Sequence, residues 1–151
     1  KKMLQDFHGK VPFMKGMLEA VMNRANTKGV IRTLLGRKCR FDLWEPTSWG
    51  VHKALPLNQA QTEYGMAIKR AHTYKALNRL IQGSAADQTK KAMVDVYEKL
   101  GIVPLIQVHD ELDCSIKNEK QGNEVKEVME NCIKLEVPSK VDIEVGESWG
   151  K

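Results

Sequence analysis

Two short apolar runs, residues 105–108 and 112–116, are separated by the titratable triplet His109, Asp110 and Glu111. Short runs of this kind around a polar triplet predict a β-hairpin with the triplet at its tip. Such a hairpin holds a carboxylate on rigid backbone at the edge of a cleft, which suits a divalent metal site. Taken alone, an ordinary exposed polar turn explains the triplet better than a metal site does.

The charge of the chain changes sign along its length. Its 151 residues have a net charge of +5, but residues 1–100 contain 18 Lys or Arg against 8 Asp or Glu, and residues 101–151 contain 6 against 11. The basic part suits phosphate contacts and the acidic part suits cations, although a solvated surface is the more common cause of either imbalance. Three cysteines without a Cys-x-x-Cys spacing indicate neither a disulfide framework nor a zinc ribbon. No apolar run approaches membrane-spanning length, so we expect a soluble cytoplasmic protein.

Apolar periodicity and turn residues predict an α+β fold, in which antiparallel strands are covered by helices on one face. In the first part we expect a helix over residues 12–28, a basic hairpin over residues 30–41 and an irregular connection over residues 42–58. A helix capped by Asn58 should follow to residue 77, and a second helix should run over residues 84–100 after a pause at residues 82–84. The second helix should bury Ala85, Ala92, Met93, Val96 and Tyr97. After the acidic hairpin we expect a helix around residues 125–133 and a last strand over residues 141–145.

Residues 77–87 read Leu-Asn-Arg-Leu-Ile-Gln-Gly-Ser-Ala-Ala-Asp, and residues 108–111 downstream read Val-His-Asp-Glu. In this order and at this approximate separation, the two segments resemble the carboxy-terminal part of family A DNA polymerases, which include bacterial repair enzymes and phage replicative enzymes. Residues 33–38, Thr-Leu-Leu-Gly-Arg-Lys, and residues 144–149, Glu-Val-Gly-Glu-Ser-Trp, resemble further elements of that family. The similarity therefore spans most of the chain and is weakest over residues 42–64.

The resemblance implies an antiparallel palm-type sheet with a catalytic hairpin, covered by helices, plus a basic hairpin and helix from the fingers side. It divides the chain into a fingers-side part, residues 1–58, and a C-terminal palm portion, residues 59–151, within one partial polymerase domain. It also implies a catalytic centre with two Mg²⁺ ions, in which Asp110 is a metal ligand and Glu111 a supporting carboxylate. By the same resemblance, His109 contacts the primer end, and Trp149 packs as a structural anchor.

For DNA binding, the resemblance places Asn78 and Gln82 at the minor groove, where their amides check the shape of a base pair without reading sequence. The alternative is that both amides only cap or interrupt helices. Arg37 and Lys38 would face DNA phosphates, whereas a solvated hairpin is the alternative from composition. At Tyr74 many relatives have an Arg that contacts DNA, so this contact is absent here or moved to Lys75, Arg70 or Arg79. Asp113 and Asp142 are interpreted as surface charges.

Two family elements are missing from these residues: the Asp-Tyr-Ser-x-Ile-Glu segment with the other aspartate, and the fingers helix that binds the incoming nucleotide. We therefore expect a fragment or split subunit of a DNA-directed DNA polymerase that is inactive without the missing segment, supplied in cis or in trans. Its partners would be primer-template DNA and a deoxynucleoside triphosphate. The alternative is a non-catalytic nucleic-acid-binding or assembly module, whose binding would depend on salt but not on Mg²⁺ or Asp110.

Overall fold

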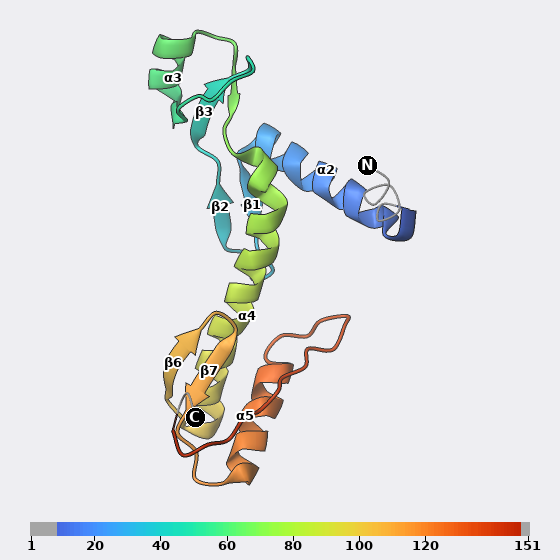
Figure 1. The fold of residues 1–151 in the computed structure, drawn as a ribbon, viewed down its shortest axis with the longest axis vertical. Coiled ribbons are helices and arrows are strands. Elements are labelled where there is room, and N and C mark those ends of the chain that lie inside the picture. Colours follow the sequence, from blue (N-terminus) through green and yellow to red (C-terminus); the bar gives the residue numbers. More distant parts are fainter. Residues whose placement is uncertain (1–8, 149–151) are drawn as a thin grey trace. The chain divides into compact units, whose positions relative to one another are not determined.

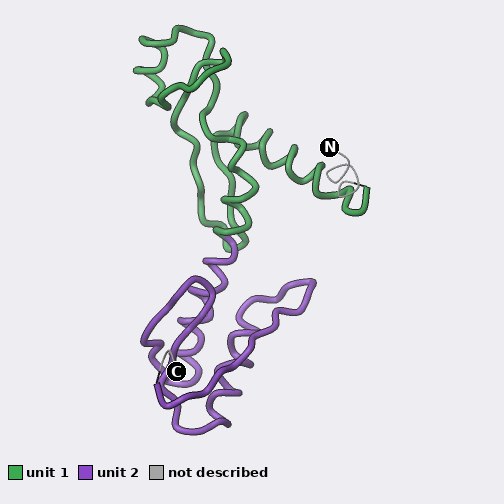
Figure 2. The backbone as a smooth tube through the Cα atoms, in the orientation of Figure 1, with its two compact units in different colours: residues 1–83 green, residues 84–151 purple. Residues whose placement is uncertain are grey.

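The computed structural model describes residues 9–148 and divides the chain into two compact units, residues 1–83 and residues 84–151 (Figure 2). The boundary between the two units lies inside helix α4 (Ala76–Leu100), because Gly83 ends the first unit and Ser84 begins the second. The expected division at residue 58 falls within the first unit. None of the described helices is long and apolar enough to cross a membrane.

The first unit begins with helix α2 (Pro12–Lys28), as the sequence predicts. Proline is tolerated in the first turn because its missing N–H would have no partner there. The helix ends at Gly29, which adopts a φ of 66° and donates its N–H to the Ala25 carbonyl at 3.0 Å. This left-handed conformation favours glycine, so the end of the helix is set locally by the sequence.

The predicted basic hairpin is confirmed as strands β1 (Val30–Arg32) and β2 (Lys38–Arg40), paired antiparallel (Figure 1). Ile31 lies opposite Cys39 and points into a core that α2 and α4 complete. This core consists of buried Ala25, Ile31, Phe41 and Ala76, with Val21, Cys39 and Leu80 packed against it. Alternation along the strands leaves Arg32, Lys38 and Arg40 exposed on the other face.

The structure corrects the expectations for residues 42–77. Residues 43–70 form a three-stranded antiparallel sheet in the order β4 (Leu55–Pro56), β3 (Leu43–Pro46), β5 (Ile68–Arg70), with helix α3 (Leu57–Tyr64) between β4 and β5. The predicted continuous helix over residues 58–77 is therefore wrong over residues 65–75, since Gly65 ends α3 with a φ of 74° and α4 (Ala76–Leu100) begins only at Ala76. Asn58 is not the cap, because Pro56 occupies that position without a side-chain hydrogen bond. A 3₁₀ turn, η1 (Thr73–Lys75), then leads into α4.

The second unit packs the rest of α4 against strands β6 (Pro104–Val108) and β7 (Glu111–Cys114) and helix α5 (Glu119–Asn131) (Figure 1). Its core consists of buried Val96, Ile102 and Val125, with Leu100, Cys114, Val128 and Met129 against them. The predicted hairpin and the helix that follows it are thus confirmed. Asn118 caps α5 by accepting a hydrogen bond from the backbone N–H of Gln121 at 2.9 Å.

Three details of α4 and the segments after it differ from expectation. There is no pause at residues 82–84, because α4 is continuous through them. Ala92 and Val96 are buried as expected, but Ala85 is exposed and 59% of Tyr97 is accessible. Residues 141–145 form no strand among the described residues, although the Val141 N–H does donate to Glu130 Oε1 at 2.9 Å. Alternation alone is insufficient where the segment finds no strand to pair with.

One buried carboxylate in α4 is stabilised by ion pairs with two lysines. Asp95 is 2% exposed and pairs with Lys91 and Lys99, each one helical turn away. The hydrogen bond from Lys91, and then the one from Lys99, hold the pKa of Asp95 below its usual value, although burial acts in the opposite direction. A buried charge is tolerated here because both of its carboxylate oxygens have a cationic partner.

Candidate nucleic-acid interface and metal-ligand hairpin

The β6–β7 hairpin presents the predicted carboxylates at a tight turn. Val108 pairs with Glu111, so His109 and Asp110 alone form the tip and Glu111 begins β7. His109 adopts a φ of 52°, and Gln107 Nε2 donates to its carbonyl. A left-handed backbone conformation is uncommon for residues other than glycine and costs free energy. Such conformations are found more often at functional sites. All three predicted side chains are exposed, so they are accessible to a ligand.

Next to this tip, Asp113 is not the surface charge expected from the sequence. It is half-buried, and its Oδ2 is buried without a hydrogen-bond partner among the described residues, whereas Asp142 is exposed as expected. Burial, and to a smaller extent the charge of Asp113, raise the pKa of the neighbouring Cys114 thiol. Asp113 lies two residues after Glu111 on the same strand, so both carboxylate side chains lie on the same face of the hairpin.

The donor chemistry of the tip fits a hard cation, because carboxylate oxygens are the ligands that Mg²⁺ takes in proteins. Asp110 and Glu111 are adjacent in sequence and exposed. Over residues 9–148, however, no three His, Cys, Asp or Glu side chains are grouped closely enough to hold a metal ion. The tip therefore offers part of a ligand set.

In the first unit, the predicted minor-groove residues lie on one exposed face of α4. Asn78 and Gln82 are four residues apart and both exposed, so they are neighbours on the helix surface. Gln82 does not interrupt the helix and Asn78 lies inside its first turn rather than at its cap position, so the alternative for both amides loses its basis. Lys75 precedes them on η1 and places its Nζ 5.5 Å from the centre of the exposed Tyr74 ring.

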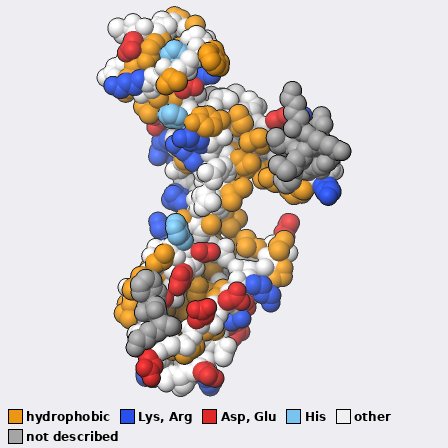
Figure 3. Space-filling view, viewed as in Figure 1, with side chains coloured by type: hydrophobic (Ala, Val, Ile, Leu, Met, Phe, Trp, Pro, Cys, Tyr) orange, Lys and Arg blue, Asp and Glu red, His pale blue; other side chains and the backbone are white. Residues whose placement is uncertain are grey.

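The four predicted basic residues behave differently from one another. All four are exposed: Arg37 and Lys38 at the β1–β2 hairpin, Lys75 on η1 and Arg79 on α4. Figure 3 shows several Lys and Arg side chains on the surface of the first unit. Although exposed, Arg37 donates from Nη2 to the Gly83 carbonyl at 2.8 Å. Arg79 places its guanidinium 5.0 Å from the centre of the Phe41 ring. Arg40 is a further exposed basic residue that was not among the predicted ones, and its spacing of two from Lys38 on β2 is the sequence signal that both side chains share a face.

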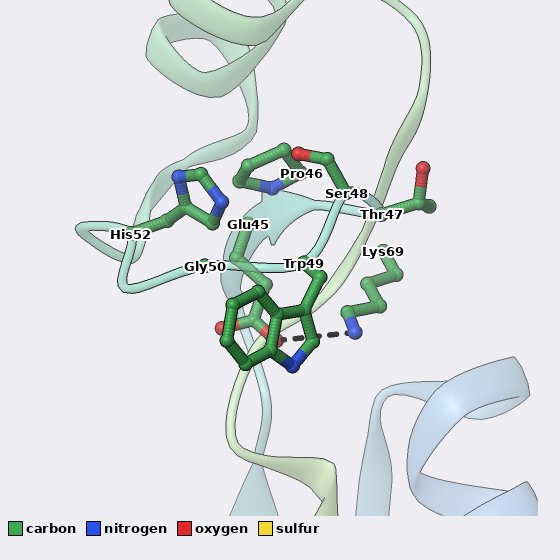
Figure 4. Close-up of a pocket in the computed structure, with 8 residues that line it drawn as sticks. All are labelled: Glu45, Pro46, Thr47, Ser48, Trp49, Gly50, His52 and Lys69. Atoms are coloured by element: carbon green, nitrogen blue, oxygen red, sulfur yellow. Dashed lines mark ion pairs between the residues drawn. The ribbon is translucent and has the colours of Figure 1, made fainter.

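A shallow pocket elsewhere in the first unit contains none of the predicted site residues (Figure 4). It lies at the end of β3, beside an ion pair between Lys69 Nζ and Glu45 Oε1 at 3.7 Å. Its lining consists of Glu45, Pro46, Thr47, Ser48, Trp49, Gly50, His52 and Lys69. The predicted site residues of each unit are thus exposed side chains outside this pocket: those of the first unit lie on α4, η1 and the β1–β2 hairpin, and those of the second unit lie at the β6–β7 turn.

Comparison with known proteins gives the family of the chain. The family model described as DNA polymerase family A matches residues 1–151, the whole of the chain. The chain belongs to DNA polymerase family A. The expected membership and the α+β fold class are thereby confirmed.

Individual proteins to which the chain is similar are also named as DNA polymerases. The chain is 42% identical over 148 residues to a DNA-directed DNA polymerase of Pseudomonas phage M6, covering 98% of this chain and 19% of the relative. It is 31% identical over 144 residues to the thermostable DNA polymerase I of Thermus filiformis, covering 91% of this chain and 15% of that protein. A solved structure, the POL domain of Pol1 from M. smegmatis in complex with DNA primer-template and dNTP, superimposes with a TM-score of 0.72 at 30% identity, over 97% of this chain and 24% of that one. The chain therefore spans less than a quarter of the length of each of these family A proteins.

Proposed function

We propose that residues 1–151 act as part of a template-directed DNA polymerase, binding primer-template DNA and contributing Asp110 to a centre with two Mg²⁺ ions. The observation that supports this most is the tight β6–β7 turn, which exposes Asp110 and Glu111 in a chain that family A matches over its whole length. The bound ions would activate the primer 3′-hydroxyl and stabilise the charge that develops as pyrophosphate leaves.

The residues of this chain have separate tasks in the proposal. Asp110 and Glu111 hold the cations, and His109 contacts the primer end from the strained first position of the same turn. Asn78 and Gln82 donate to minor-groove acceptors that all base pairs share, so they check pair geometry independently of sequence. Lys38 and Lys75 bind phosphates, and the solved relative in complex with primer-template and dNTP supports DNA and a nucleotide as partners.

The remaining ligands of the centre would come from a segment outside this sequence, in cis or in trans. The other aspartate of the family's centre has no counterpart here. Strand β6 also exposes apolar side chains, with Leu105 68% and Ile106 44% accessible, and within residues 9–148 it pairs only with β7. An apolar edge strand of this kind favours pairing with a further strand. Because the other aspartate is missing, residues 1–151 alone should bind DNA without extending a primer.

Two matched variants in the complete gene product test the catalytic role. Asp110→Asn should abolish primer extension in Mg²⁺ while leaving the Kd for primer-template unchanged. Asp142→Asn removes the same charge from another exposed position of the second unit and should leave both quantities unchanged. Wild-type turnover by the Asp110 variant would reject the assignment.

The second candidate is a non-catalytic DNA-binding or assembly module. The observation that favours it is that the described residues contain no complete group of metal ligands. Such a module would bind primer-template with strong salt dependence, but neither Mg²⁺ nor Asp110→Asn would alter that binding, and it would extend no primer. Primer extension by the complete gene product excludes this candidate.

A further inference from the structure

Two sequence elements that lie 46 residues apart meet at Gly83. Arg37 Nη2, in the turn of the β1–β2 hairpin, donates to the Gly83 carbonyl of α4 at 2.8 Å. A Cβ atom on Gly83 would lie 2.8 Å from Thr33 Cγ2 and 3.3 Å from Arg37 Nη2. Real Cβ atoms essentially never show a contact as short as the one to Thr33, and the one to Arg37 is tighter than usual, so glycine at this position lets the hairpin turn come near the helix.

The turn itself is well ordered by its own hydrogen bonds. The Thr33 N–H donates to the Arg37 carbonyl at 3.0 Å, and the Gly36 N–H donates to the Thr33 carbonyl at 2.9 Å. The Gly83 carbonyl has a second lone pair that can accept a donor from outside the helix. Arg37 thus joins an ordered turn to an ordered helix, and a rigid guanidinium fork suits this better than the flexible ammonium of lysine.

The contact lies directly beside the face of α4 that carries Asn78 and Gln82. Arg79, one turn before Gly83, also faces the hairpin, with its Nη1 4.0 Å from Cys39 Sγ. Each residue of α4 that faces the hairpin directly follows a predicted minor-groove residue: Arg79 follows Asn78, and Gly83 follows Gln82. Successive helical residues are about 100° apart, so the two faces adjoin. The position of the β1–β2 hairpin against α4 therefore determines which hairpin side chains lie next to Gln82.

We propose that Arg37 is a positioning residue rather than a phosphate ligand: it fixes the β1–β2 hairpin against α4 so that Lys38 and Gln82 engage the same duplex. This replaces the phosphate contact expected for Arg37 from the sequence, and it rests on the proposed DNA-binding function. Lys38, the next residue along the chain, supplies the phosphate contact and is the matched control.

The salt dependence of DNA binding separates the two roles. In the complete gene product, Lys38→Ala should reduce the slope of log K against log salt by about 0.9, the value for one lost phosphate contact on duplex DNA. Arg37→Ala should leave that slope unchanged. It should instead reduce the preference for a matched over a mismatched primer end by roughly fivefold to tenfold, the size of effect of one ordinary hydrogen bond, because solvent weakens the charge of Arg37 at this exposed position.

Two further variants keep every charge and so isolate the contact itself. Gly83→Ala should reproduce the loss of mismatch discrimination, because the new Cβ displaces Thr33 and Arg37. Arg37→Lys should also fail to restore discrimination, although a phosphate ligand would be rescued by lysine. In the Arg37→Ala background, Gln82→Ala should cost less than it does alone, because the two side chains act on the same duplex step.

Hydrogen exchange gives a readout that does not depend on DNA. The Thr33 amide and the amides of β1 and β2 should exchange faster in both Arg37→Ala and Gly83→Ala than in the wild type. Unchanged exchange in both variants, or a slope that falls by about 0.9 in Arg37→Ala, would overturn the proposal. If the wild type fails to bind primer-template, the proposed function fails instead, and the exchange rates alone decide whether Arg37 fixes the hairpin.

Discussion

Gly29 and Gly101 each follow the last residue of a helix, one in each unit. We expect substitution by alanine to reduce the free energy of unfolding by different amounts at the two positions. They end α2 and α4 with φ angles of 66° and 67°, and their N–H groups donate to the Ala25 and Tyr97 carbonyls at 3.0 Å and 2.9 Å. A Cβ on Gly29 would lie 2.5 Å from Arg70 Cζ, whereas a Cβ on Gly101 meets nothing within 4 Å. The two positions thus share a backbone penalty and differ in one contact.

The difference can be estimated from what Arg70 holds. Placing alanine in the left-handed region costs about 1–2 kcal/mol at either position. At Gly29 the new methyl group also displaces Arg70, which donates from Nη1 to the Phe41 carbonyl at 2.7 Å and stacks 4.6 Å from the centre of the Trp44 ring. Losing a charge-assisted hydrogen bond of a half-buried group adds about 1.5 kcal/mol, and losing the cation–π contact adds about 0.5 kcal/mol. We therefore expect Gly29→Ala to cost about 3–4 kcal/mol and Gly101→Ala about 1–2 kcal/mol.

Native-state hydrogen exchange measures the opening free energy of each unit by its own amides, so it suits a chain with two compact units. In an Arg70→Ala background, the extra cost of Gly29→Ala should fall to that of Gly101→Ala, because the atom it collides with is gone. Equal costs for the two glycine variants in the wild-type background would refute the reasoning. So would a cost of Gly29→Ala that is the same with and without Arg70.

The free energy that the ion pairs of Asp95 contribute should be present above about pH 4 and be lost as the pH falls below it toward the lowered pKa of the folded state. Acid unfolding of Asp95→Asn should lack this component, and curves that fall in parallel with the wild type below pH 4 would contradict it. Burial raises the pKa of the Cys114 and Cys132 thiols, so both should alkylate more slowly at neutral pH in the folded protein than in denaturant, as peptide mass mapping would show. Asn118→Ala should destabilise α5 by about 1 kcal/mol, because the Gln121 N–H loses its cap, whereas Asn118→Asp should not; exchange of the α5 amides distinguishes the two.

The elements that the sequence predicted correctly have local signals. Helix α2 has proline in its first turn and a left-handed glycine after its last, and α5 has an asparagine cap. The β6–β7 hairpin is bounded by its own polar turn. In contrast, β5 was mistaken for helix, because its strand conformation depends on pairing with β3, where Trp44 lies opposite Arg70. A pairing between residues 26 apart leaves no local pattern, and tertiary context overrides propensity there.

By itself, the sequence determined which residues are candidates. Motif order pointed to Asp110, Asn78 and Gln82, and family A membership agrees with the motifs that named them. Only the tertiary structure decided what the side chains contact: Arg37 and Lys38 are both exposed neighbours in the sequence, yet Arg37 donates to the Gly83 carbonyl. The physical reason is that a motif specifies residue types along the chain, while the partner of a guanidinium is fixed by backbone that folding brings near from 46 residues away.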